Sequence, residues 1–442
     1  MTGLWLSGLW LSGSILFALT MAALSLHVPG ALSIGSLTLK SWFVAMGGAS
    51  AAVYLVTVWS VTHRPGARGA IWIVLLVAAG LRLPLIVSPP FLSTDVYRYV
   101  WDGRVQAEGI NPYRYLPADP ALASLRDDLV YPRINRADYA PTIYPPTAQL
   151  VFASVGYLWS SVAGTKATMV GFEALTVFCL LRLLAAARLP AERVLIYVWN
   201  PLPVWAFAGN GHVDAAAIGL LSTALLLRVR HRDGWAGVAF GLAILVKFLP
   251  AVVAPVLWRR RAGWLMAGAA MVTMIALYGL YGSVGTRIFG FLNTYGSEEG
   301  YDTGEGFWLL AGIARLMPLP PTAVYLYKAA TVTMLAGVAA WFALVRRPDD
   351  PVALCAAAGT TMALLTFAIS PHYPWYFAWL AMPCVLAPTP SVLWMATSPI
   401  LLYLDTFGDR FIWPSVVFVP ALGLACASLL TSRTAEPMKG AA

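Results

Sequence analysis

Residues 90–143 hold the side chains with which this sequence could do chemistry. Seven of the chain's 20 acidic residues lie in this stretch of 54, together with six arginines and seven interleaved tyrosine and tryptophan residues. Aromatic rings pack on the apolar faces of sugars. Carboxylates accept hydrogen bonds from hydroxyl groups, and arginine binds phosphate oxygens through a planar fork. The stretch therefore predicts a binding site for a sugar and a phosphate.

The densest part of this stretch is the run STDVYRYVWDGR at 93–104. On a helix, Asp95, Tyr99 and Asp102 share one face. Arg98 and Asp102 are also spaced to form an ion pair, so a solvated surface salt bridge is the alternative for them. We predict catalytic roles for Asp95 and Asp102 and substrate-binding roles for Arg98 and Tyr99. Asp95 is the expected general base, ionised at an ordinary pKa of about 3.9.

The composition places this chemistry in a membrane protein. The chain has 442 residues, of which 59% are hydrophobic and 11% charged, and its mean hydropathy is +0.72. Soluble chains carry about 25% charged residues. The net charge of +9 comes from short basic clusters between apolar runs, which argues against nucleic-acid binding. The sequence therefore predicts an all-α polytopic membrane protein.

Apolar segments recur along the whole chain. They fall near 9–28, 42–62, 70–89, 147–163, 168–187, 194–208, 213–229, 235–258, 262–283, 322–345, 352–369, 375–389, 391–404 and 412–431. Two full spans at 147–187 would break the pattern of basic loops, so one element between 147 and 229 should be half-length or re-entrant. The segment 235–258 should be a short broken hairpin that turns at KFLP, residues 247–250.

The basic clusters between these segments predict the orientation. Short cytoplasmic loops are rich in Lys and Arg. The candidate cytoplasmic residues are Arg64, Arg68, Arg228, Arg230, Arg232, Arg259, Arg260, Arg261, Arg346, Arg347, Arg433 and Lys439. We expect a multi-pass protein of the inner (plasma) membrane with both termini in the cytoplasm. Loops 90–143 and 284–306 then lie on the external or periplasmic face, and the active site with them.

Several ionisable residues lie within or beside the apolar segments. Such residues are costly in a membrane and are usually functional. His212 and Asp214 separate two apolar segments, and Lys247 lies inside a third. His372 and Tyr373 stand where a segment leaves the membrane. We predict that all five bind the donor. The alternatives are a helix cap for His212, snorkelling for Lys247 and an aromatic belt around His372.

Several motifs, in this order, resemble the GT-C superfamily of membrane glycosyltransferases. Besides the acidic residue Asp95 just past a membrane helix, they are EGINPY at 108–113, YPP at 144–146, GNGHVD at 209–214, KFLP at 247–250 and SPHYPWY at 370–376. The closest similarity is to bacterial polyprenol-phosphate-mannose-dependent mannosyltransferases. One departure is that two apolar segments, rather than none, precede the helix that leads into the loop.

The resemblance implies a GT-C-like helical bundle with a large first external loop that carries the catalytic residues and short helices. It divides the chain into N-terminal transmembrane helices at 1–69, a catalytic transmembrane module at 70–431 with its external loop at 90–143, and a cytoplasmic tail at 432–442. It implies an inverting transfer of a hexose, mannose by family, from a polyprenyl-phosphate sugar to an envelope glycan or lipid, with Asp95 as the base.

No cofactor is expected, because the sequence has no metal-spaced Cys and His set and no P-loop. A divalent cation at Asp95 and Asp102 is a weaker alternative. The expected partners are the donor, the acceptor and membrane lipids. The alternative function is a secondary transporter or lipid flippase, which broken helices and intramembrane charges would also suit.

Overall fold

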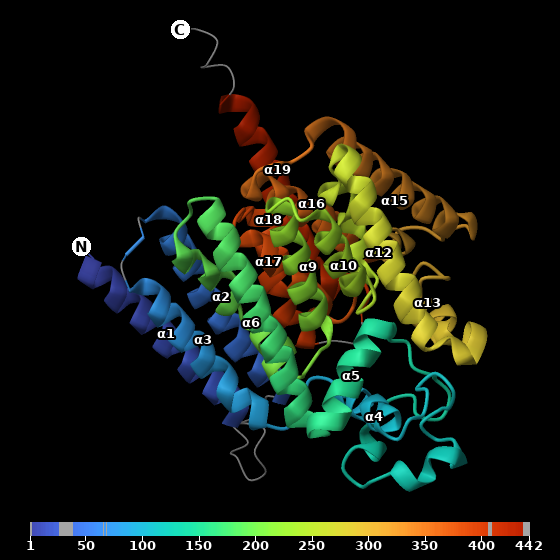
Figure 1. The fold of residues 1–442 in the computed structure, drawn as a ribbon. Helices are drawn as coiled ribbons and strands as arrows, with labels where there is room; N and C mark the ends of the chain where they lie inside the picture. The colour runs from blue at the N-terminus through green and yellow to red at the C-terminus, as the bar shows by residue number, and fades with distance from the viewer. Residues whose placement is uncertain (1, 26–38, 65, 68, 405–408, 436–442) are drawn as a thin grey trace.

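The computed structural model describes residues 2–25, 39–64, 66–67, 69–404 and 409–435. The protein is 76% helical, and the described residues contain no β-strand. In Figure 1 most helices run side by side, while the loop with α4 (Asp95–Ala107) and α5 (Pro146–Trp159) projects below them. The prediction of an all-α polytopic membrane protein is confirmed.

Eight helices in the described residues are long and apolar enough to cross a membrane. They are α1 (Thr2–Ser25), α2 (Leu39–His63), α3 (Ala70–Val87), α6 (Val162–Ala186), α12 (Arg260–Leu280), α15 (Thr322–Ala340), α16 (Pro351–Ile369) and α19 (Ile412–Ala435). All of them except α16 expose large apolar side chains, which suits contact with lipid; no residue of the window through α15 is buried. Helices span because their backbone groups bond within the segment.

The chain between α6 and α10 is broken. After α7 (Leu195–Val198), the turns α8 (Pro201–Pro203) and η4 (Val204–Gly209) lead into α9 (Asp214–Val229) with a bend of 119°. Gly211 has φ +71, and a Cβ there would lie 2.9 Å from Val96. The bend thus brings residues 210–214 against the start of α4. Since α5 has only 14 residues, the prediction of a half-length or re-entrant element here is confirmed.

The segment 235–258 forms the predicted broken hairpin. Helix α10 (Asp233–Ile244) ends before Lys247, and the short helices η5 (Leu249–Val253) and α11 (Ala254–Leu257) follow. The chain returns to where it began, because Arg259 pairs with Asp233 at 3.6 Å. The turn that carries Lys247 therefore lies at the far end of the hairpin, inside the bundle.

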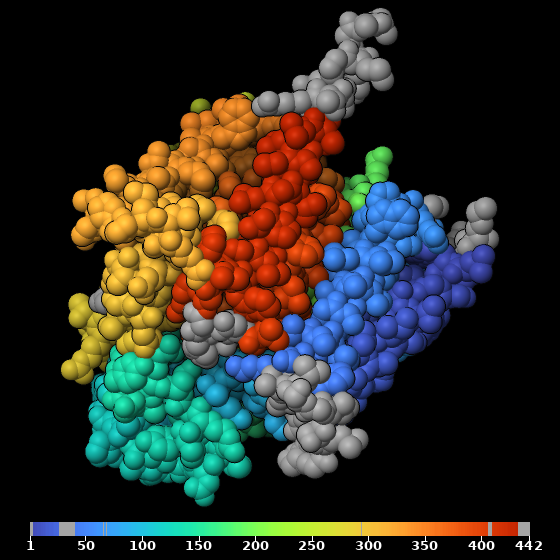
Figure 2. All heavy atoms as spheres, turned by 180° about the vertical axis from the view of Figure 1, so that it is seen from behind, coloured from blue at the N-terminus to red at the C-terminus, as the bar shows by residue number. Residues whose placement is uncertain are grey.

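The two long loops lie together. The first contains α4, η1 (Pro120–Leu125) and η2 (Tyr131–Arg133), and the second contains α13 (Leu292–Glu298). Tyr281 Oη donates to Gln106 Oε1 at 2.8 Å, and Tyr139 Oη donates to Glu298 Oε1 at 2.7 Å. The space-filling view shows the first loop as a lobe at one end of the molecule (Figure 2).

Basic residues gather at the opposite end. Arg228, at the end of α9, pairs with Asp349 at 3.4 Å, and Glu192 accepts from the backbone of Ala67 at 3.0 Å. Arg68 and Lys439 lie outside the described residues, as does the side chain of Arg433. The loops and basic clusters thus separate as expected, and the assignment of each end to a side of the membrane stays a prediction.

The C-terminal part closes the bundle around a large apolar core. It comprises α14 (Trp308–Ala314), η7 (Trp341–Arg346), η8 (Pro374–Leu380), α17 (Ala381–Cys384), α18 (Pro390–Thr397) and η9 (Ser398–Leu404). The core is the main apolar cluster and packs residues of α1, α3, α6, α9 and α18 together.

A buried ion pair joins α3 to α6. Arg82 binds Glu173 through two bonds, at 2.6 and 2.9 Å, and donates to the carbonyl of Val198 at 2.8 Å. The two side chains are only 7% and 3% exposed. Arg82 and Glu173 therefore have a structural role, which is to hold α3 against α6.

Candidate active site

A cavity of about 760 Å³ lies between the two long loops and the bundle. Its wall comes from the start of α2, the start of α4, residues 135–145, the turn at 246–249, α13 and η8. The structure brings six of the nine predicted site residues to this wall. They are Asp95, Arg98, Tyr99, Asp214, Lys247 and Tyr373. Asp102, His212 and His372 do not line it.

Asp95 is the first residue of α4, where the helix dipole favours a negative charge. Its side chain is 21% exposed and faces the cavity. Asn135 Nδ2 donates to Oδ1 at 3.0 Å, and His212 Nδ1 lies 3.7 Å from Oδ2. Burial raises the pKa of Asp95 above 3.8, although Asn135 and Lys247 oppose that rise. The expectation of an ordinary pKa is therefore wrong.

His212 lies behind Asp95 rather than in the cavity. It is fully buried, and its ring stacks on Trp375 with 4.0 Å between centroids. Neither ring nitrogen has a hydrogen-bond partner in the described part of the chain. The structure thus places His212 where it contacts the carboxylate side of the site, and not where a donor in the cavity would touch it.

Lys247 and Asp214 form an ion pair in the cavity wall. Lys247 Nζ lies 2.7 Å from Asp214 Oδ1 and 3.4 Å from the centre of the Tyr376 ring. The two side chains are 20% and 10% exposed, so the cavity reaches both. Lys247 therefore points inward and does not snorkel to the membrane surface. Its ammonium already has a carboxylate partner, which the sequence did not suggest.

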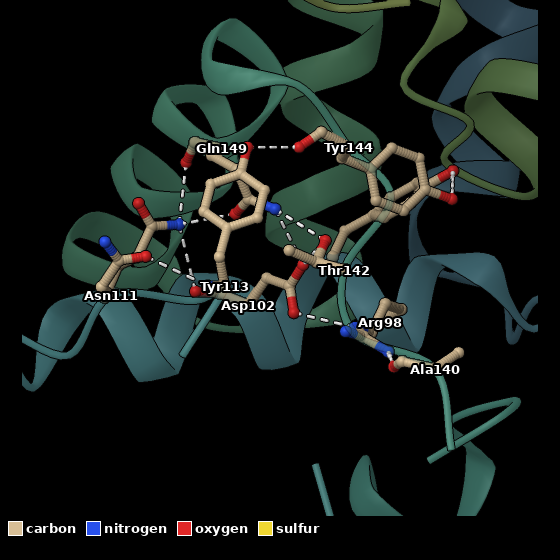
Figure 3. Close-up of polar contacts among 10 residues, drawn as sticks. Arg98, Asp102, Asn111, Tyr113, Ala140, Thr142, Tyr144 and Gln149 are labelled. Carbon is tan, nitrogen blue, oxygen red and sulfur yellow. Dashed lines mark hydrogen bonds and ion pairs between the residues drawn. The ribbon is translucent and has the colours of Figure 1, made fainter. Parts of the chain in front are cut away.

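Asp102 lies in a closed network, shown in Figure 3. Arg98 Nε donates to Oδ1 at 2.9 Å, while Thr142 and Gln149 donate to Oδ2 at 2.6 and 3.0 Å. The Asp102 side chain is 2% exposed. Arg98 also donates to the Ala140 carbonyl at 3.0 Å. Asp102 is buried, does not line the cavity and has both oxygens hydrogen-bonded, so the structure favours the pairing role over the catalytic role.

The same network bears on the cation considered between Asp95 and Asp102. Asp102 already receives bonds from Arg98, Thr142 and Gln149, so it has little capacity to coordinate a metal with Asp95. Within the described ranges, no group of three or more His, Cys, Asp or Glu side chains is arranged to hold a metal ion.

His372, like His212, is buried and does not line the cavity. It is 8% exposed, and its Nε2 lies 3.4 Å from the carbonyl of Glu299. Burial, aided by Arg410, lowers the pKa of His372 to about 4, so the ring is neutral at pH 7. Tyr373 lines the cavity and stacks on Trp375 at 4.7 Å. Of the SPHYPWY motif, Tyr373, Trp375 and Tyr376 line the cavity, whereas His372 does not.

Arg136 and Glu298 connect the two loops at the cavity rim. Their ion pair measures 2.7 Å, and Tyr139 also donates to Glu298. Burial opposes ionisation of Glu298, but the bonds from Arg136 and Tyr139 lower its pKa below the ordinary value. Arg136 lines the cavity with a positive φ of 58°. This ion pair fixes loop 90–143 to loop 284–306.

The sequence missed Asn135, Arg136, Tyr295 and Tyr376 as site residues. All four line the cavity, and the hydroxyl groups of Tyr295 and Tyr376 lie 2.9 Å apart. Asn135 and Arg136 do fall within the chemically rich loop. Only the composition of the loop pointed to these two residues. No sequence pattern predicts that Asn135 contacts Asp95, which lies 40 residues earlier in the chain.

Comparisons with known proteins agree on one family. The family model for the N-terminal domain of alpha-(1->6)-mannopyranosyltransferases matches residues 1–268. Alpha-(1->6)-mannopyranosyltransferase A of Mycobacterium tuberculosis is 26% identical over 69% of this chain and 63% of its own length. The protein of the same name from Corynebacterium glutamicum is 28% identical over 40% and 36%. The chain thus spans less than two thirds of these two relatives.

A third relative, from Mycolicibacterium smegmatis, is described as a probable alpha-(1->6)-mannopyranosyltransferase. It is 24% identical over 80% of this chain and 72% of its own length. No solved structure matches the chain.

The matched range contains the polar half of the cavity wall. It includes Asp95, Asn135, Asp214 and Lys247, whereas Tyr373 and the other lining residues of the C-terminal part lie beyond it. It covers 268 of 442 residues, which is more than half. The resemblance to membrane mannosyltransferases is confirmed, and the chain belongs to the family defined by the N-terminal domain of alpha-(1->6)-mannopyranosyltransferases.

Proposed function

We propose that this protein is a membrane mannosyltransferase that takes mannose from a polyprenyl-phosphate donor and adds it to a mannose-containing glycan or lipid of the cell envelope. The observation that carries the proposal is the cavity wall, where a carboxylate, an ammonium and several aromatic rings face one space. Family membership supports mannose, and the relatives' names support an α-1,6 linkage.

The cavity suits a lipid-linked donor. Lys247 and Arg98 offer cationic groups for a phosphate, and Tyr99, Tyr373 and Tyr376 offer rings for a sugar face. Phe43 and Phe91 form an apolar part of the same wall, on the side of α2, which suits the first prenyl units. The donor would thus enter from the bilayer with its phosphate held in the wall.

The proposed reaction is a single displacement. An acceptor hydroxyl oxygen attacks the anomeric carbon of mannose, the bond from that carbon to the phosphate oxygen breaks, and the configuration inverts. The hydroxyl proton passes to Asp95, and the lipid phosphate leaves with the bonding electrons. A raised pKa brings Asp95 closer to neutrality, where a general base works best. Lys247 stabilises the charge that grows on the phosphate.

The proposed face of the membrane is external. The basic clusters lie at the end opposite loop 90–143, and such clusters favour the cytoplasmic side. A cysteine at the exposed Ala123, in a Cys426→Ser background, should react with an impermeant maleimide in intact cells. The other native cysteines are buried and serve as internal controls. Labelling only after lysis would place the site in the cytoplasm.

The decisive experiment is transfer by the purified protein in lipid nanodiscs. It should move radiolabelled mannose from polyprenyl phosphate to a short α-1,6-linked mannose oligosaccharide, and the product should be cleaved by an α-1,6-mannosidase. GDP-mannose should not replace the lipid donor. Movement of the lipid donor across proteoliposomes without any transfer would replace this proposal with the flippase alternative.

A further inference from the structure

Asp95 differs from Asp102, the other carboxylate of α4, in how its oxygens are used. Oδ1 accepts one side-chain hydrogen bond, from Asn135 at 3.0 Å. Oδ2 has no donor within hydrogen-bond distance in the described residues, and its nearest basic atom is His212 Nδ1 at 3.7 Å. One oxygen is therefore anchored and the other can accept a proton.

Asn135 can orient this carboxylate because its own position is fixed from both sides. Ile134, just before it, is buried against Val100 and Trp101 of α4. Arg136, just after it, pairs with Glu298 at 2.7 Å. A carboxylate only accepts hydrogen bonds, so the amide must present Nδ2 to it. Asn135 thus comes to Asp95 already oriented.

The segment that follows is fastened as well. The backbone of Ala140 donates to the carbonyl of Arg136 at 3.0 Å, and the carbonyl of Ala140 accepts from Arg98 at 3.0 Å. Since Arg98 also binds Asp102, the closed network holds the loop that carries Asn135. The loop is therefore rigid where it crosses the start of α4.

We propose that Asn135 is the positioning residue of the Asp95 carboxylate, holding one oxygen so that the other faces the acceptor hydroxyl. This inference rests on the proposed function, in which Asp95 is the base. Asn135 acts through Asp95 and is not itself a catalytic residue. A fixed base loses little entropy on reaching the transition state, and a misplacement of about 1 Å can cost 10²-fold in rate.

The bond to Asn135 also favours the ionised form of Asp95, because it is made to the charged state. Removing it should raise the pKa of Asp95 further, so the acidic limb of the rate profile should move to higher pH. Several other groups face Asp95 and set the baseline for this shift. They are Tyr99, Arg136, Tyr144, His212, Asp214, Lys247, Tyr373 and Tyr403.

The test compares Asn135→Ala and Asn135→Asp in the transfer assay across pH. Asn135→Ala should lower kcat about tenfold to a hundredfold, with KM for the donor little changed, and move the acidic limb up by about one pH unit. Asn135→Asp should move it further, because two carboxylates at this distance resist joint ionisation. An unchanged limb in both variants overturns the proposal.

Asn111→Ala is the matched control. Asn111 belongs to the same loop, donates to the Tyr281 carbonyl and to Ser283 at 3.1 Å, and does not line the cavity. Asn111→Ala should keep the acidic limb of the pH–rate profile at its wild-type position, even if it lowers the melting temperature. A shift as large as that of Asn135→Ala would reduce Asn135 to a loop-packing residue. If Asp95→Asn retains full turnover, the assignment of Asp95 as the base fails, and the role of Asn135 with it. If the wild-type protein transfers no mannose at all, the proposed function itself fails.

Discussion

Helix α4 carries two carboxylates in opposite environments. Asp95, the first residue of α4, has one hydrogen-bonded oxygen, one oxygen without a donor among the described residues, and access to the cavity. Asp102, two turns later, has both oxygens bonded and no access. Both residues are acidic, aromatic-flanked and seven positions apart. The difference teaches that chemistry in this loop depends on which carboxylate the fold leaves unsatisfied.

Two ion pairs inside the bundle repeat the contrast. Arg82 and Glu173 are sealed at 7% and 3% exposure, whereas Lys247 and Asp214 reach the cavity at 20% and 10%. A sealed pair holds helices together, since removing one partner strands a charge away from water. A pair in a cavity wall can exchange its partner for a ligand. Variants of the Arg82–Glu173 pair should therefore lose stability, whereas variants of the Lys247–Asp214 pair should lose ligand binding.

Asp95→Asn should have the largest effect on turnover. It keeps the shape of the side chain and removes the proton acceptor, so kcat should fall by about 10² to 10⁴. Donor binding and the melting temperature should change little, because the side chain touches the cavity through one free oxygen. Single-turnover transfer measured with saturating donor checks this. Near wild-type turnover would mean that Asp95 is not the base.

Arg82→Met should have the largest effect on folding. It strands Glu173 in the core and should cost about 3 to 5 kcal/mol of stability. Thermal unfolding in detergent, followed by size-exclusion chromatography, measures the loss. The double variant Arg82→Met/Glu173→Leu should recover much of it, since a sealed apolar pair replaces the ionic one. If Arg82→Met alone were as stable as wild type, the pair would have no structural role.

Lys247→Met should impair donor binding rather than folding. The protein should still fold, because Asp214 keeps contact with the cavity, but affinity for polyprenyl phosphate should fall about tenfold or more. Binding of the lipid donor to the purified variant, measured by thermophoresis, tests this. Unchanged donor affinity would leave Lys247 only its structural pair with Asp214.

Asp102→Asn should destabilise the protein and slow it only indirectly. The change leaves Arg98 buried without its counter-charge, at a cost of about 3 kcal/mol. Turnover, corrected for the folded fraction, should fall less than in Asp95→Asn. Equal or greater loss of kcat in well-folded Asp102→Asn would reverse the assignment of the two carboxylates.

Glu298→Gln should have the smallest effect. Its ion pair with Arg136 is about 30% exposed on each side, and such pairs contribute about 0 to 1 kcal/mol. The lowered pKa of Glu298 means that the wild-type pair is intact at neutral pH and weakens as pH falls through that pKa. Limited proteolysis of loop 284–306 at pH 7 and at a pH below this lowered pKa should show more cleavage at the lower pH. The variant should lose this difference.

Residue order determined the class of this protein and the region of its site. Apolar runs long enough to cross a bilayer leave few folds other than a helical one, because backbone groups in lipid must bond within the segment. The broken hairpin at 235–258 was predictable from its length and its proline. Loop 90–143 was predictable as the site because charged and aromatic residues gather there, and charged residues have no role in contact with lipid.

The tertiary structure decided which of those residues meet. Asn135 lies 40 positions from Asp95, and Tyr376 lies 129 from Lys247, so no local pattern relates them. His212 and His372 read as ligands in sequence but are buried behind the wall. Burial and free lone pairs are properties of packing around a side chain. The sequence therefore identified the residue types of the site, whereas the fold determined which of those residues can contact a substrate.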